Sequence, residues 1–121
     1  MALIVSKPTE PKIVHNWPVV VYTALDEGKI RKDEIFVDYQ VLPQSEVDGL
    51  IEAASRDGQS ADIVILRSSV KSINGLVDEA NGPIPFNDET FADALDRVNV
   101  RGAMAASFFD VQNGRKPARK N

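Results

Sequence analysis

Residues 35–54 read IFVDYQVLPQSEVDGLIEAA, and the spacing of their apolar side chains changes at Pro43. Before the proline, apolar and aromatic side chains fall on alternate positions, as in a half-buried strand: Ile35, Val37, Tyr39 and Val41. After it, they recur three and four residues apart, as on one face of a helix: Val47, Leu50, Ile51 and Ala54. A strand that leads into a helix predicts an α+β domain.

A second strand is expected upstream, at the branched and aromatic run Val19-Val20-Val21-Tyr22. The segment between the two runs contains Asp26-Glu27-Gly28 and further charged residues up to Glu34. A connection of this kind suits an antiparallel hairpin with an exposed turn better than a parallel crossover.

The downstream sequence predicts helices. Ser45 is the expected cap of the first, which ends near Gly58. The second begins near Ser60 and ends at Asn74-Gly75. Its apolar stripe continues at helical spacing: Ile63, Leu66, Val70, Ile73 and Val77. A core-facing surface is the favoured interpretation of that stripe, and a groove for a partner is the alternative.

Two more helices follow the turn over residues 81–86, which contains two prolines. Asn87 is the expected cap of the third helix and Asn99 of the fourth, which Gly114 closes. The predicted fold class is therefore α+β, mainly helical, with an amino-terminal antiparallel β-hairpin packed on about four short α-helices.

The chain has 121 residues, the size of one ordinary domain. We expect residues 1–11, with two prolines, to form an extended arm and residues 12–114 to form a single globular domain. Residues 115–121 have four cations and no apolar side chain larger than alanine, so we expect a flexible basic tail.

Composition argues against an enzyme. The sequence has no cysteine and one histidine, His15, with no nucleophile motif to pair with it, so we expect an exposed or edge-strand histidine. The acidic pairs Asp78-Glu79 and Asp88-Glu89 are better explained by a solvated turn and a helix start than by a metal. We expect no catalytic centre, no cofactor, no metal and no membrane span.

Charge is segregated along the chain. Because the whole sequence carries −4 and the tail carries +4, residues 1–114 carry −8. The tail could solvate the terminus, or contact phosphates or an acidic protein surface. Nucleic acid is the less favoured partner, because the tail lacks aromatic residues for base stacking and the body is acidic.

The order of several short motifs resembles the tail assembly chaperones of long-tailed bacteriophages, over roughly residues 19–121. The motifs that carry the resemblance are Leu42-Pro43-Gln44-Ser45-Glu46, Gly75-Leu76-Val77-Asp78-Glu79, residues 81–86, Val100-Arg101, Phe108-Phe109, Arg115-Lys116 and Lys120-Asn121. The family often has tryptophan shortly before the glycine of the second motif, whereas this chain has Ile73.

The resemblance implies a protein that binds the tape measure protein, keeps it soluble and promotes polymerisation of the tail tube around it. It also implies self-association, residence in the host bacterial cytoplasm and absence from the mature virion. A longer frameshifted form would recruit the tail tube protein, and this chain would be the short form. The alternative is a small regulatory domain that contacts nucleic acid or an acidic partner through its basic tail.

Adjacent residues on a helix point about 100° apart, so Phe108 and Phe109 cannot both face one core, and one of them is a candidate contact residue. The candidate partner-binding residues are Arg101, Phe108, Phe109, Arg115, Lys116, Arg119 and Lys120. We also expect a homo-oligomer, because the short helices have more apolar surface than one small core needs.

Overall fold

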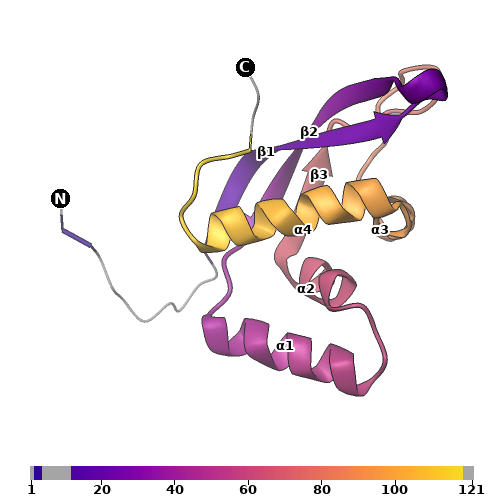
Figure 1. The fold of residues 1–121 in the computed structure, drawn as a ribbon. Helices are drawn as coiled ribbons and strands as arrows, with labels where there is room; N and C mark the ends of the chain where they lie inside the picture. The colour runs from indigo at the N-terminus through magenta and orange to yellow at the C-terminus, as the bar shows by residue number, and fades with distance from the viewer. Residues whose placement is uncertain (1, 4–11, 119–121) are drawn as a thin grey trace.

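The computed structural model describes residues 2–3 and 12–118 (Figure 1). Its elements, in chain order, are β1 (Ile13–Ala24), the short 3-10 helix η1 (Asp26–Gly28), β2 (Ile30–Gln40), α1 (Gln44–Arg56), α2 (Ala61–Ser69), β3 (Val70–Asn74), α3 (Asp88–Asp96) and α4 (Val98–Gln112). The expected arm, residues 1–11, lies almost entirely outside the described residues.

The strands form one antiparallel sheet in the order β1-β2-β3. The helices lie on one face of it, with α4 alongside β1 and α1 packed on α2 away from the sheet (Figure 1). The α+β fold class and the amino-terminal antiparallel hairpin are therefore confirmed. The hairpin turn over residues 25–30 is exposed, as its charged composition predicted.

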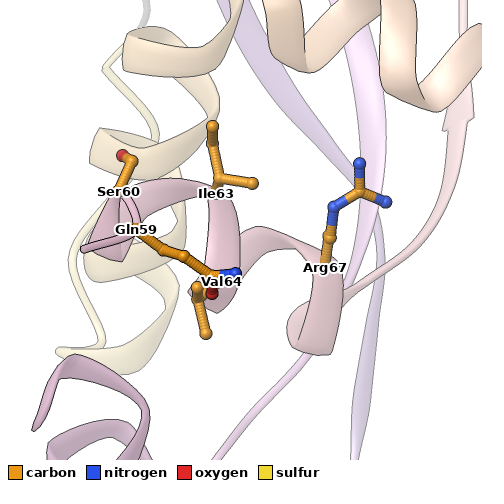
Figure 2. Close-up of a pocket in the computed structure, with 5 residues that line it drawn as sticks. All are labelled: Gln59, Ser60, Ile63, Val64 and Arg67. Atoms are coloured by element: carbon orange, nitrogen blue, oxygen red, sulfur yellow. The ribbon is translucent and has the colours of Figure 1, made fainter. Parts of the chain in front are cut away.

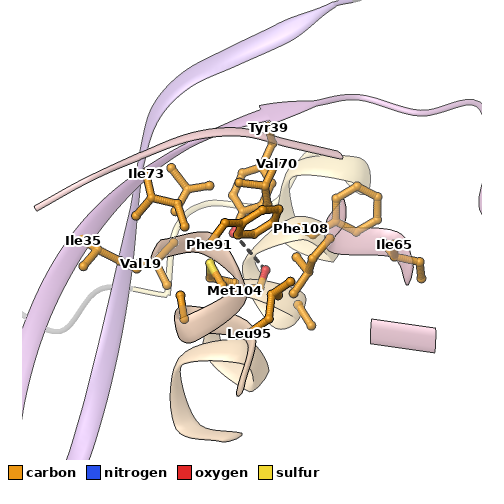
Figure 3. Close-up of a cluster of buried hydrophobic side chains, with 14 of the residues drawn as sticks. Val19, Ile35, Tyr39, Ile65, Val70, Ile73, Phe91, Leu95, Met104 and Phe108 are labelled. Atoms are coloured by element: carbon orange, nitrogen blue, oxygen red, sulfur yellow. Dashed lines mark hydrogen bonds between the residues drawn. The ribbon is translucent and has the colours of Figure 1, made fainter. Parts of the chain in front are cut away.

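The core lies between the sheet and the helices. In β2, Ile35, Val37 and Tyr39 are buried, so the predicted alternation is confirmed up to Tyr39. It fails after the strand ends at Gln40, because Leu42 is buried and Val41 is only half-buried. Tyr39 donates a hydrogen bond of 2.8 Å from its hydroxyl to the carbonyl of Met104 in α4 (Figure 3). The Phe108 ring meets the Tyr39 ring edge-on at 6.2 Å between centroids. These contacts attach α4 to the middle of the sheet.

The prediction of one helix from Ser60 to Asn74 is wrong in its last third, because α2 ends at Ser69 and residues 70–74 form β3. Val70 and Ile73 are both buried, as the stripe required, whereas its last member, Val77, lies beyond β3 and is 53% exposed. Residues three apart in a regular strand face opposite sides, but the β2–β3 register shifts at Lys71 and brings both side chains to the core. The strand also gives the backbone of β2 a second hydrogen-bonding partner.

The helix caps are partly as expected. The Asn87 side chain accepts a hydrogen bond from the Thr90 amide and the Thr90 hydroxyl accepts one from the Asn87 amide, so the predicted cap of α3 is confirmed. Ser45 and Asn99 are not caps, because α1 and α4 begin one residue before each of them.

Two of the three predicted glycine ends are confirmed, whereas Gly75 follows a strand instead of a helix. Gly58 and Gly114 follow α1 and α4 with φ of +69° and +65°. After α4, the Arg115 amide donates a hydrogen bond to the Asp110 carbonyl at 2.8 Å, and the Gly114 amide donates one to the Val111 carbonyl. These two hydrogen bonds form a Schellman motif, which ends the helix.

The turn between β3 and α3 reverses the chain, as its prolines and glycine predicted. Val77 pairs with Pro83 in an isolated antiparallel bridge. The Asp78 carboxylate accepts hydrogen bonds from the amides of Ala80 and Gly82, at 2.9 and 2.8 Å. Asp78 is therefore part of a solvated turn, the structural role expected for the Asp78-Glu79 pair.

Candidate interaction surface

The sheet has one face that no described helix covers, the upper face in Figure 1. We call it the open face. Its residues follow from the strand register, because paired residues on neighbouring strands point to the same side. Val19 pairs with Ile35 and both are buried, so the next pair, Pro18 with Phe36, points to the open face.

An apolar row follows β1 along the open face and extends onto β2. It consists of Pro18, Val20, Tyr22, Ile30 and Phe36. Tyr22 and Ile30 keep 43% and 59% of their surface exposed. The other three are half-buried by their neighbours and are not among the side chains that pack on the core. On β2 the charged residues Lys32 and Glu34 lie on the same face between Ile30 and Phe36, opposite Tyr22 and Val20. Because exposed apolar side chains that lie together are typical of interaction surfaces, the row is a candidate site.

Polar side chains bound the apolar row at the opposite end of the sheet from the hairpin turn. A β-bulge at His15 and Asn16 lies opposite Asp38. The Asp38 carboxylate accepts the Asn16 amide at 2.8 Å and contacts Nδ1 of His15 at 3.2 Å. The Asn74 side chain donates to the Asn16 side chain at 3.4 Å. This polar cluster joins all three strands. Asn16 has a φ of +54°, an unfavourable backbone conformation for most residues, and its hydrogen bonds to Asp38 and Asn74 stabilise it in the bulge.

The structure separates the two phenylalanines proposed as contact residues. Phe108 is fully buried between the sheet and the helices, so it belongs to the core and is not a surface contact. Phe109 is half-buried against the core, with its ring 5.2 Å from that of Phe108. The two side chains point apart, and only Phe109 keeps part of its surface exposed.

The cations proposed as contact residues lie at both ends of α4. Arg101 in its first turn donates from Nη1 to the carbonyl of Leu95, at 3.1 Å, and so holds the junction of α3 and α4 together. Arg115 and Lys116 follow the other end and are exposed. Arg119 and Lys120 lie outside the described residues. The candidates that the structure describes therefore do not lie together in one site.

A shallow hollow of about 340 Å³ lies on α2, lined by Gln59, Ser60, Ile63, Val64 and Arg67. Figure 2 shows that Ile63 and Val64 point in different directions around the helix. The Arg67 guanidinium lies 5.9 Å from the centre of the Phe91 ring. With one cation engaged on a ring and no convergent set of polar groups, the hollow has little to orient a small molecule.

The single histidine and the buried Tyr39 both lie in the sheet. His15 is exposed on the edge strand β1, as expected, with 68% of its side chain accessible. Burial raises the pKa of the Tyr39 phenol well above its usual range. Over residues 2–3 and 12–118, no cluster of three or more histidine or carboxylate groups has the geometry of a metal site.

Comparisons with known proteins give no relative for the chain. No family model matches it, and no curated protein or solved structure is similar to it. Among the described helices, none has both the length and the apolar character needed to cross a membrane.

One feature of the sequence, the apolar run over residues 19–22, is related to the open face but was not among the predicted partner-binding residues. Four consecutive apolar residues, 19–22, lie in a strand of an antiparallel sheet. A strand with one solvated face alternates apolar and polar residues, whereas a continuous run is typical of a strand covered on both faces. The helices cover one face of β1, and the run places Val20 and Tyr22 on the other face.

Proposed function

We propose that the protein is a tail assembly chaperone of a long-tailed bacteriophage, which binds the tape measure protein, keeps it soluble and promotes polymerisation of the tail tube around it. The observation that carries the proposal is the apolar row of the open face. The order of motifs over residues 19–121 supports the same class of protein.

The shape of the open face suits a helical client. A tape measure protein is a very long helical chain, and its apolar faces would aggregate if they stayed exposed. The apolar row spans two neighbouring strands, about 5 Å apart, and is long enough to receive several turns of an amphipathic helix. Burial of the row against such a helix would remove apolar surface from water on both proteins.

The proposal is tested by co-expression with the product of the very long helical open reading frame that should lie downstream of the gene. Tyr22→Lys places a charge in the apolar row, and Ile51→Lys is the matched control. Ile51 has 40% exposure, close to the 43% of Tyr22, but lies on α1 away from the sheet. We expect the control to keep the client soluble and Tyr22→Lys to lose most of the soluble client.

Equal loss with both variants, each folded by circular dichroism, would refute a role for the open face. The rival function, contact with nucleic acid or an acidic partner through the basic tail, predicts a different salt response. Binding to phosphates weakens steeply as salt is raised, whereas burial of apolar surface does not. Client binding that persists at high salt supports the chaperone.

A further inference from the structure

We infer that Pro18 and Asn99 close the outer edge of β1 against strand pairing with a second copy of this chain. β1 lies at one end of the sheet order, so one side of its backbone faces away from β2. An edge strand of 12 residues is a ready template for another strand unless something blocks it. This inference does not depend on the proposed client.

The backbone groups that face outward can be assigned from the hairpin. The Leu25 amide donates to the Lys29 carbonyl at 2.8 Å, which makes this pair a hydrogen-bonded one. Hydrogen-bonded and non-hydrogen-bonded pairs alternate along an antiparallel ladder. Thr23 pairs with Arg31 in the same register, two residues before the Leu25 pair. The backbone groups of the odd-numbered residues from Trp17 to Thr23 therefore form hydrogen bonds with β2. The even-numbered residues, Pro18, Val20 and Tyr22, direct their backbone groups outward.

The side chain of Asn99 in α4 confirms this assignment for Tyr22. Its Nδ2 donates to the Tyr22 carbonyl at 2.9 Å and lies 3.2 Å from Oγ1 of Thr23. Because that carbonyl faces away from β2, the Asn99 amide occupies the edge where another strand would lie. Pro18 removes a second outward group, since proline has no N–H to donate.

These two features block the same hydrogen bond. If two β1 strands pair antiparallel about a two-fold axis at Val20, Pro18 of one copy lies opposite Tyr22 of the other. The bond required at that position runs from an amide at residue 18 to the carbonyl of residue 22. Pro18 lacks the donor and Asn99 engages the acceptor, and the two-fold axis repeats the defect on the other side of Val20. Two symmetry-related hydrogen bonds of such a dimer therefore cannot form.

This arrangement predicts that neither single substitution opens the edge. Pro18→Val restores the donor but leaves Asn99 at the carbonyl, and Asn99→Ala frees the carbonyl but leaves no donor. Only Pro18→Val/Asn99→Ala restores the complete bond, so the two changes are strongly coupled. Asn113→Ala serves as the control, because Asn113 in the same helical region also bonds a backbone carbonyl, that of Phe109, at 2.8 Å.

The test is hydrogen exchange at the Val20 amide, which faces outward. In the native protein, both single variants and the control, we expect fast exchange that does not change with protein concentration. In the double variant, protection of Val20 should rise at least about tenfold between dilute and millimolar protein as dimers form. The amides of Val19 and Val37, within the β1–β2 ladder, report whether each variant is folded.

Three results would overturn the inference. Concentration-dependent protection of Val20 in the native protein would mean that the edge is already in use. Equal opening by either single variant would contradict the shared bond. A folded double variant in which Val20 exchanges freely at every concentration would mean that Pro18 and Asn99 are not what keeps the edge closed.

Discussion

At the scale of single residues, Tyr39 connects the sheet to α4. Its ring is fully buried and its hydroxyl donates to the Met104 carbonyl (Figure 3). The alternation of apolar residues around it predicted that the ring would be buried. The acceptor was not predictable, because residue 104 is 65 positions away and only tertiary packing brings the two together.

Tyr39→Phe should lower the free energy of unfolding by about 1 kcal/mol, because it removes one buried hydrogen bond and keeps the ring. Chemical denaturation monitored by circular dichroism measures the change. Tyr22→Phe is the control, since Tyr22 is exposed on the open face and should be within about 0.5 kcal/mol of the native protein. An equal effect of both substitutions would contradict the role of the Tyr39 hydroxyl.

The same residue gives a pH dependence. Burial disfavours the phenolate and raises the pKa of Tyr39 in the folded state above the unfolded value of about 10. Its contribution to stability is therefore complete below pH 10 and is lost as the pH rises above it. The free energy of unfolding should fall above pH 10 more steeply in the native protein than in Tyr39→Phe. Parallel pH profiles would rule out this contribution.

At the scale of elements, the caps show which local signals were sufficient. Asn87 and Thr90 form a reciprocal capping pair at the start of α3. Asn87→Ala should therefore cost about 1 kcal/mol of stability. Ser45→Ala should cost much less, because α1 already begins at Gln44 and the serine makes no cap hydrogen bond. Thermal unfolding of the two variants compares them directly, and a larger loss for Ser45→Ala would contradict the observed helix starts.

A pair of glycines should respond to alanine with opposite signs. Gly75, after β3, has a φ of +97°, and an added Cβ would lie 3.4 Å from the Glu34 carbonyl oxygen. Gly75→Ala should destabilise the protein by roughly 1 kcal/mol or more. Gly49 lies inside α1 with open space around it, so Gly49→Ala should stabilise by up to about 1 kcal/mol. Denaturation midpoints that move in the same direction would contradict this account.

The third strand shows where prediction from the sequence failed. Val70 and Ile73 fit a helical stripe, and their burial satisfied that pattern. Periodicity could not distinguish a helix from a bulged strand, because a bulge also lets residues three apart share a face. Pairing with β2, more than 30 positions earlier in the sequence, determined the outcome. The hairpin, by contrast, is local and was predictable from its two runs and its turn.

At the scale of the whole molecule, the basic segment that begins at Arg115 follows α4. Arg115 and Lys116 leave the end of α4, whereas α3 at the other end has acidic residues in its first turn. Deletion of residues 115–121 should leave the core folded, because the Schellman end at Gly114 closes α4 before the tail. It should weaken self-association at low salt, as each exposed ion pair adds at most about 1 kcal/mol.

Sedimentation of the native and truncated proteins at two salt concentrations tests this prediction, with circular dichroism as the control for folding. Unfolding of the truncated protein, or association that is identical at every ionic strength, would contradict the role of the tail. Sedimentation of the native protein also tests the expected homo-oligomer.

The candidate site was less predictable than the fold. Sequence reasoning selected cations and the Phe108-Phe109 pair, yet Phe108 is in the core and Arg101 bonds a backbone carbonyl. The apolar row was visible only after the strand register showed which residues of the run over 19–22 lie on the uncovered side. Helix placement decides which face of a sheet stays open, and a single sequence does not contain that information in local form.

The central claim is that the client lies on the open face. The most direct measurement is an NMR titration of the isotope-labelled protein with a helical segment of the tape measure protein. We predict that amide signals at Val20, Tyr22, Ile30 and Phe36 shift or broaden, while those of Gln59 and Val64 at the α2 hollow stay unchanged. Changes confined to α2 or to Arg115 and Lys116, with the open face unaffected, would contradict the account.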